Sequence, residues 1–248
     1  MENAPTIRLI AQKIQPDYEE RLLNWILEVY YPLQIAIPGY EQIDFYQIVK
    51  ENPQYTKFLT IAHYTNRSAQ LKVRSDQRWK DTTTDTATWA GRSEYVWFVP
   101  YEQNTSVQKD LTNEDKKILS GPADTAIIHI EGYAFPNQQQ ERYDSWFNKW
   151  GREVYIPLLM RLPGLKGYSS YKLIEIETTG LPEMSARPRT MDYPQRLSIL
   201  HFDNIKAFEN YEQSLELSAI KGAIQAPFPL GLNYQFYVQY RLVRRYRK

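Results

Sequence analysis

Three side chains suited to proton transfer occur in the second half of the chain. His129 and Glu131 are two residues apart in the segment TAIIHIEGYAF, so in a β-strand both side chains point to the same face. His201 lies in a second strand-like segment, QRLSILHF. Imidazole titrates near neutral pH and also binds metals, so this trio can move protons during an enolisation or hold a metal ion. A hydrogen-bonded structural role is the alternative for each histidine.

Aromatic side chains indicate an apolar pocket. The chain has 20 tyrosines, 9 phenylalanines and 6 tryptophans. Such residues can line a site for a flat or polyketide-like molecule, or they can fill the core between two sheets. His63, in FLTIAHYTN, is the counterpart of His201 in the first half, and Arg8 falls roughly where His129 lies in the second. The residues expected to bind substrate are Tyr30, Tyr46, His63, Trp97, Tyr171 and Phe236.

Composition and missing motifs exclude several classes of function. The 248 residues are 42% hydrophobic with a net charge of +1, which predicts a globular protein without the field that attracts nucleic acid. The chain has no cysteine, so disulfides, thiolate metal sites and cysteine nucleophiles are excluded. It has no apolar run of about 18 residues and no leader pattern, which predicts a cytoplasmic protein that does not bind membranes. The phosphate-binding loops and the nucleophile-elbow motif are absent as well.

A repeated sequence motif divides the chain into two halves. Residues 25–39 read WILEVYYPLQIAIPG and residues 150–164 read WGREVYIPLLMRLPG, without a gap at an offset of 125. Weaker matches continue to the end of each half. This predicts a first repeat over 1–105, a polar linker over 106–123 and a second repeat over 124–248.

Each repeat alternates between strand and helix periodicity. In the first, TIRLIAQKI is strand-like, and Leu22, Ile26, Val29 and Leu33 then form the apolar face of a helix that Pro-Gly ends. Two strands follow, then a helix beginning at Asn66, or at residues 203–204 in the second copy, and then a last strand. Ile205, Phe208, Tyr211 and Leu215 are the expected buried side of that second helix.

The order βαββαβ, occurring twice, predicts two ferredoxin-like repeats of the α+β class. Both helices then cover one face of a four-stranded antiparallel sheet, and the free faces of the two sheets pack together as a barrel. Because the helices should cover the apolar face, His129 and Glu131 are expected on the other face. The first and third strands are neighbours in this topology, which should place His129 near the strand that carries His201.

At these residues a family resemblance emerges. The pattern W-x4-Y-x-P-x5-P-G, followed by GYSSYKL in the second half, resembles the EthD-like branch of the dimeric α/β-barrel proteins. The resemblance implies a dimeric barrel folded within one chain, and activities that include cofactor-free isomerases, cyclases, decarboxylases and oxygenases. In that family a histidine usually occupies the positions of Tyr30 and Tyr155. A phenol has a pKa of about 10, so here these side chains suit hydrogen bonding to an oxyanion better than proton abstraction.

We therefore expect an enzyme that needs no cofactor and transforms a hydrophobic cyclic or polyketide-like substrate by acid–base chemistry. The expected catalytic residues are Glu131, His129, Tyr155 and His201. We expect a monomeric pseudo-dimer and leave further pairing of two chains open. One alternative is a ligand-binding or accessory protein without catalysis. A third option is a haem enzyme with a histidine ligand to the iron.

Overall fold

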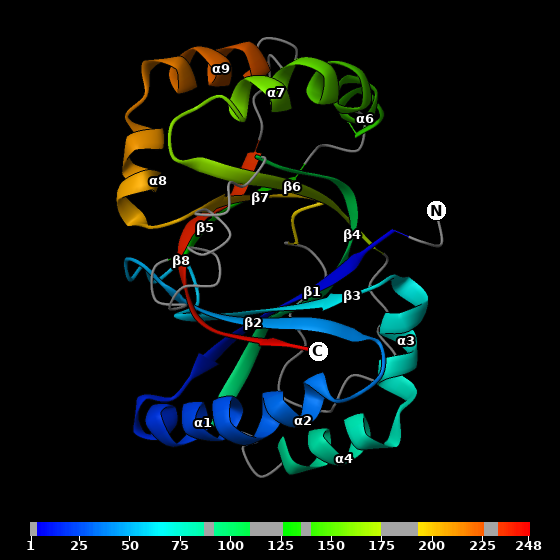
Figure 1. Ribbon diagram of the computed structural model, residues 1–248. Coiled ribbons are helices and arrows are strands. Elements are labelled where there is room, and N and C mark those ends of the chain that lie inside the picture. The colour runs from blue at the N-terminus through cyan, green and yellow to red at the C-terminus, as the bar shows by residue number, and fades with distance from the viewer. Residues whose placement is uncertain (1–3, 87–91, 110–125, 135–139, 175–192, 226–232) are drawn as a thin grey trace. The chain divides into compact units, whose positions relative to one another are not determined.

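The computed structural model describes residues 4–86, 92–109, 126–134, 140–174, 193–225 and 233–248 (Figure 1). Most of the expected linker lies outside them. The fold is α+β, as the sequence predicts, and its eight strands follow the closed-barrel order β1-β3-β2-β8-β5-β7-β6-β4. The strands are β1 (Thr6–Ile14), β2 (Tyr40–Ile48), β3 (Phe58–Tyr64), β4 (Ser93–Gln108), β5 (Ile127–Ala134), β6 (Leu165–Leu173), β7 (Arg196–Phe202) and β8 (Asn233–Arg247).

The chain forms two compact units that repeat the same elements. Unit 1 comprises Met1–Asn104, Lys172–Asp192 and Leu242–Lys248, and unit 2 comprises Thr105–Tyr171 and Tyr193–Arg241. Strands β4 and β8 are therefore each divided between the units. The helices of unit 1 are α1 (Glu19–Trp25), α2 (Tyr31–Ile35), α3 (Arg67–Ser75) and α4 (Gln77–Thr86), and those of unit 2 are α6 (Gln140–Trp146), α7 (Ile156–Leu159), α8 (Ile205–Glu212) and α9 (Leu215–Gln225).

In each unit the helices cover one face of the strands. In unit 1, β1 pairs with β3 and β4, and β3 also pairs with β2, all antiparallel. Apolar side chains of α1, α2 and α3 pack on Phe45, Phe58 and Ala62 of this sheet. Figure 1 shows the ribbons of α1 and α2 on one side of the strands β1, β2 and β3. In unit 2, β5 pairs with β7 and β8, and its helices pack on Leu200 and Phe202. The predicted adjacency of first and third strands is confirmed in both units.

The repeated motif contains a π-helical segment. Ile26–Tyr30 connects α1 to α2, and Phe147–Tyr155 connects α6 to α7, each ending two residues before a proline. Proline lacks an N–H and crowds the carbonyl four residues earlier, so the wider π-helical turn accommodates it. Because the turn hydrogen-bonds five residues apart, it stacks Trp25 on Tyr30, with ring centroids 5.2 Å apart, and Trp150 on Tyr155 at 6.0 Å.

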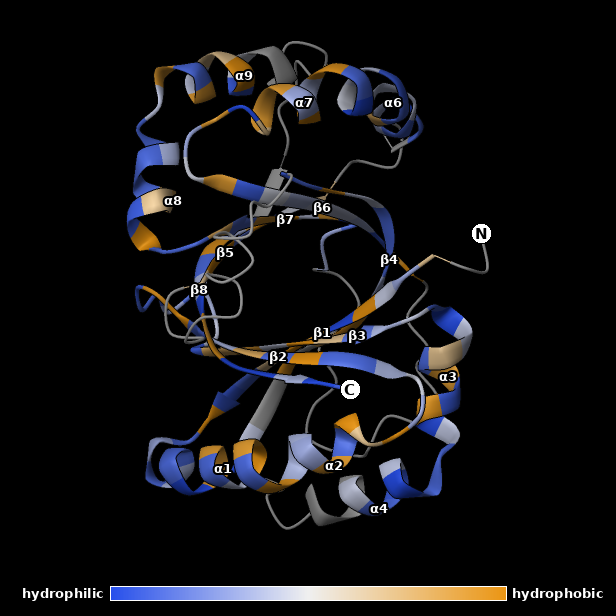
Figure 2. Cartoon of the chain, in the orientation of Figure 1, coloured by the Kyte–Doolittle hydropathy of each residue, from blue (hydrophilic) through white to orange (hydrophobic). Residues whose placement is uncertain are grey.

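This segment overturns part of the predicted helix face. Leu22 and Ile26 are buried as expected, but Val29 is 43% exposed and Leu33 is 50% exposed. A π-helical turn takes more residues per turn than an α-helical one, so the buried face continues at Tyr31 instead. A simple 3.6-residue period therefore misplaces Val29 and Leu33 on the buried face. Figure 2 shows hydrophobic and hydrophilic stretches alternating along the same helices.

Short local signals at the helix starts are confirmed. The side chains of Asn66 and Asn204 each accept a hydrogen bond from the backbone N–H three residues ahead, at 2.9 Å, and so cap α3 and α8. The Pro-Gly pairs follow the helices and do not end them, because α2 already ends at Ile35 and α7 at Leu159. Gly39 and Gly164 lie in the turns just before β2 and β6, with φ of 112° and 81°. A Cβ at Gly164 would also lie 2.1 Å from a backbone oxygen of α8.

The second helix of unit 2 is interrupted, which corrects a prediction. Phe208 and Tyr211 are buried as expected, but Leu215 is 86% exposed and Ile205 is 39% exposed. The chain leaves α8 after residue 212, and the Ser214 hydroxyl accepts a hydrogen bond from the N–H of residue 217 to start α9. Among the described residues, every helix falls short of the length and apolarity needed to span a bilayer.

Candidate functional site

The expected catalytic pair of unit 2 lies beneath the helices. His129 pairs with Leu200 and Glu131 with Ser198 across β5 and β7, and Leu200 belongs to the core that packs against α8. The His129 ring also lies 5.3 Å from the ring of Phe208 in α8. The expectation that this pair occupies the face away from the helices is therefore wrong. The helix-covered face carries a polar network as well as apolar side chains.

The hydrogen bonds of this network explain why it can be buried. His129 Nε2 lies 3.3 Å from Glu131 Oε1, and Tyr133 donates its hydroxyl hydrogen to Glu131 Oε2. Gln239 Nε2 is 2.9 Å from the other ring nitrogen of His129. Burial works to raise the pKa of Glu131, but the hydrogen bonds and charge interaction with His129 outweigh it and lower that pKa. A fully satisfied polar network of this kind is stable in a core.

His129 is poorly placed to act as a base. Both its ring nitrogens are engaged, its ring packs edge-on against Tyr237 at 4.3 Å, and its exposed fraction is 0%. The structure also separates His201 from it. His201 pairs with Ile128, so its side chain is on the opposite face of the sheet from His129. The expected trio is thus reduced to a His129–Glu131 pair with structural partners.

Tyr155 and Tyr30 pack as aromatic residues of the π-helical segments. Tyr155 is 7% exposed and its ring contacts Trp146 as well as Trp150. The remaining expected residues are distributed over several strands: Tyr46 on β2, His63 on β3, Trp97 on β4, Tyr171 on β6 and Phe236 on β8. The side chain of Trp97 lies outside the described part of the structure, and Tyr171 and Phe236 are buried in unit 2.

Two expected residues, Tyr46 and His63, meet around a carboxylate that was not predicted. Asp44 lies between them, its side chain only 2% exposed, and its Oδ2 is 3.6 Å from His63 Nε2. Tyr46 donates its hydroxyl hydrogen to the same oxygen over 3.0 Å. Asp44 pairs with Ile61 and not with a residue of the helix-facing core, so this cluster occupies the face away from the helices.

Further donors hold the Asp44 carboxylate. Arg245 near the end of β8 binds it through two hydrogen bonds, Nε to Oδ1 at 2.7 Å and a terminal nitrogen to Oδ2 at 2.9 Å. Gln42 adds a third, at 2.7 Å. Burial acts to raise the pKa of Asp44, but its contacts with His63 and Arg245 are stronger and lower it well below the ordinary range. Asp44 is therefore a permanent carboxylate at neutral pH.

The second unit lacks this carboxylate. At the motif offset Asp44 corresponds to Ser169, and Arg245 corresponds to Ser106 on the equivalent long strand β4. Their hydroxyls are 3.0 Å apart, so a neutral hydrogen bond replaces the ion pair. His201 thus has no Asp44 counterpart, and the two histidines of the repeat are not chemically equivalent. Sequence reasoning could have found Asp44 by following the repeat position by position in search of differences.

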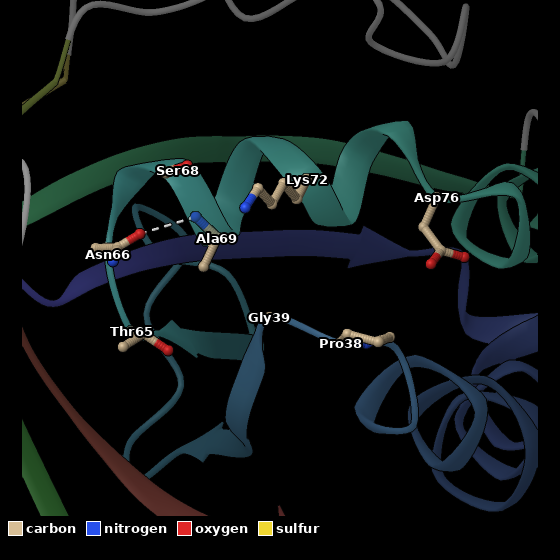
Figure 3. Close-up of a pocket in the computed structure, with 8 residues that line it drawn as sticks. All are labelled: Pro38, Gly39, Thr65, Asn66, Ser68, Ala69, Lys72 and Asp76. Atoms are coloured by element: carbon tan, nitrogen blue, oxygen red, sulfur yellow. Dashed lines mark hydrogen bonds between the residues drawn. The ribbon is translucent and has the colours of Figure 1, made fainter.

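A surface pocket of about 400 Å³ lies where α3 begins (Figure 3). Pro38 and Gly39 form one side, and residues of α3 with its preceding loop form the other. Asp76 at its end is already bound by Arg78, at 2.8 and 2.9 Å. The pocket contains none of the expected site residues and no acid–base pair. Among the described residues, no group of three or more His, Asp or Glu side chains is arranged to hold a metal ion.

Comparison with solved structures identifies the class of fold. A structure described as an anthrone oxidase-like protein is 12% identical with a TM-score of 0.64, covering 99% of this chain and 93% of that one. A candidate monooxygenase from Fusobacterium nucleatum is 9% identical with a TM-score of 0.62, covering 100% and 96%. A candidate chlorite dismutase is 10% identical with a TM-score of 0.54, covering 98% and 96%.

These neighbours place the chain in the dimeric α/β-barrel class of folds. At such low identity the likeness establishes the fold alone. No protein-family model and no curated protein matches the sequence. The EthD-like branch accordingly remains a resemblance in the motif.

Proposed function

We propose that the chain is an enzyme in which His63, oriented by Asp44, removes a proton from a hydrophobic ring-containing substrate without a bound cofactor. The observation that carries this proposal is the difference in exposure between Asp44 and His63. Asp44 is buried and ionised, whereas the His63 side chain, 3.6 Å away, is 29% exposed. A partly exposed imidazole beside a buried, ionised carboxylate is the arrangement that general-base catalysis requires.

The residues of the cluster divide the work. His63 Nε2 faces Asp44, so Nδ1 is the nitrogen that takes the proton. Asp44 stabilises the imidazolium that results, while Arg245 and Tyr46 keep Asp44 ionised and fix its orientation. Burial and the Asp44 charge raise the pKa of Tyr46 well above its usual value, so Tyr46 acts as a hydrogen-bond donor and not as a base.

The first step is proton transfer from a carbon next to a carbonyl group to His63, which leaves an enolate. Isomerisation or cyclisation of that enolate completes the reaction, and His63 returns the proton. In a decarboxylation the enolate forms instead by loss of carbon dioxide, and protonated His63 supplies the proton. Two neighbours, described as anthrone oxidase-like and as a candidate monooxygenase, favour a second candidate function. In it, the same enolate donates electrons to molecular oxygen and forms a carbon–oxygen bond, which gives a peroxide. The O–O bond then breaks as the carbon loses its remaining hydrogen, so that a new carbonyl group and water are formed.

Hydrogen exchange at carbon tests the common first step. Ring ketones with acidic C–H groups, anthrone among them, are incubated with the protein in D2O under nitrogen, and deuterium incorporation is followed by NMR. We expect His63→Ala to slow protein-catalysed exchange by about 100-fold or more. His201→Ala is the matched control, because His201 occupies the equivalent position without a carboxylate, and it should leave the rate unchanged.

The remaining alternatives give different results. Equal rates for the wild type and His63→Ala would remove His63 as the base. Tight binding of these ketones with no acceleration would indicate a ligand-binding protein instead. Oxygen uptake on admitting air would select the monooxygenase candidate. A Soret band in the purified protein would select the haem-dependent option.

A further inference from the structure

A buried arginine in unit 1 forms no ion pair with any residue that the structure describes. Arg8 lies in the middle of β1 and is 2% exposed, yet no ion pair among the described residues includes it. Its Nε atom is buried without a hydrogen-bond partner. Burying an unpaired charge is among the costliest arrangements in a folded protein. A bound anion would therefore stabilise this guanidinium.

The surroundings of Arg8 are apolar and aromatic. Its cross-strand neighbours are Ala62 on β3 and Pro100 on β4. The guanidinium carbon is 4.6 Å from the ring centroid of Phe98 and 5.8 Å from that of Tyr64. Aromatic faces attract a cation, but they cannot accept the five N–H hydrogen bonds that a guanidinium offers.

A second orphan donor accompanies the first. The Tyr64 hydroxyl is buried next to Tyr40, and it forms no hydrogen bond of ordinary geometry within the part of the chain that the structure describes. The neighbouring Tyr40, with its ring centroid 4.9 Å from that of Tyr64, donates its own hydroxyl hydrogen to Gln34. Burial holds the pKa of Tyr40 well above its ordinary value, so this phenol stays neutral and does not balance the charge of Arg8.

We propose that Arg8 and Tyr64 form a binding site for the carboxylate group of a small apolar acid, between the sheet of unit 1 and the helices that cover it. One fixed positive charge matches one carboxylate, and the aromatic walls match an apolar body. Strongly hydrated anions such as phosphate lose more solvation energy on entering such a site. Arg8 pairs with Ala62 and not with His63, so this site is on the opposite face of the sheet from the His63–Asp44 pair.

Calorimetric titration of the full chain with sodium benzoate, at constant ionic strength, tests the site. Benzamide has the same ring without the charge, and it should bind at least about tenfold more weakly. Arg8→Met should abolish benzoate binding. Arg78→Met is the matched control, because Arg78 is an exposed arginine of the same unit, and it should bind benzoate like the wild type.

Tyr64→Phe keeps the proposal falsifiable if Arg8→Met does not fold. It removes only the hydroxyl group and should weaken benzoate binding by about three- to tenfold. Failure of the wild type to bind benzoate would overturn the site. Equal binding of benzoate and benzamide would also overturn it, as would undiminished binding to the folded Arg8→Met variant. None of these results depends on the activity of His63.

Discussion

The carboxylate of Asp44 is the centre of a hydrogen-bonded cluster of side chains. Asp44 accepts hydrogen bonds from Gln42, Tyr46 and Arg245 while it lies beside His63. Gln42 and Tyr46 each lie two residues from Asp44, whereas Arg245 is separated from it by 201 residues. Each of them looks unremarkable in its own segment. The sequence alone does not show that these side chains share Asp44 as a partner. It therefore predicts an acid–base site in the second half of the chain and not in the first.

The Asp44 cluster predicts a pH dependence of stability. The folded-state pKa of Asp44 is lowered, so its stabilising effect is complete above the unfolded value of about 4 and is lost as the pH falls toward the folded value. Asp44→Asn leaves Arg245 buried without its carboxylate, and should lower the free energy of unfolding at pH 7 by about 3 kcal/mol. Urea unfolding between pH 7 and pH 3 measures this difference, which should narrow below about pH 4. A difference in unfolding free energy between the wild type and Asp44→Asn that stays constant from pH 7 to pH 3 would contradict the lowered pKa of Asp44.

At the scale of the element, the π-helical segment is what the motif W-x4-Y-x-P encodes. Tryptophan and tyrosine five residues apart would point in different directions on an α-helix, yet they stack in both units. The proline two residues beyond the tyrosine stabilises the wider turn. The motif that specifies the π-helical turn therefore occurs twice in the sequence. A search for 3.6-residue periodicity does not detect it.

The register shift gives a direct test with two truncations in one helix. Ile26 is 3% exposed and precedes the shift in burial, whereas Val29 is 43% exposed. Ile26→Ala should cost about 2–4 kcal/mol of unfolding free energy. Val29→Ala should cost less than about 0.5 kcal/mol, because it removes exposed atoms. Chemical denaturation of both variants measures the contrast. Similar losses would mean that the helix continues in the α-helical register.

At the scale of the whole molecule, the repeat predicts the fold well and the chemistry poorly. The strand order, the asparagine caps and the Pro-Gly turns follow from local patterns that both halves share. Chemistry depends on the positions where the halves differ, such as Asp44 against Ser169. It also depends on which face of a strand becomes covered. The position of His129 shows that hydrophobicity alone does not decide this, because hydrogen-bonded polar groups can occupy the covered face.

The symmetry suggests moving the ion pair from one unit to the other. Ser169→Asp alone places a carboxylate in a buried position without a cation, and should destabilise unit 2. Adding Ser106→Arg supplies the equivalent of Arg245 and should recover at least about 1 kcal/mol. A double-mutant cycle of unfolding free energies measures this coupling. Additive effects of the two substitutions would show that the positions are not equivalent in geometry.

The division of β8 between the units bears on how the protein is made. Residues 242–248 belong to the first unit although they are synthesised after every segment of the second unit, and they bring Arg245 to Asp44. Until then the nascent first unit has a carboxylate without its cation and a sheet without its final strand segment. Its folding cannot finish in the usual order of synthesis, amino-terminal part first. The first unit can complete its ion pair only after the second unit has been synthesised.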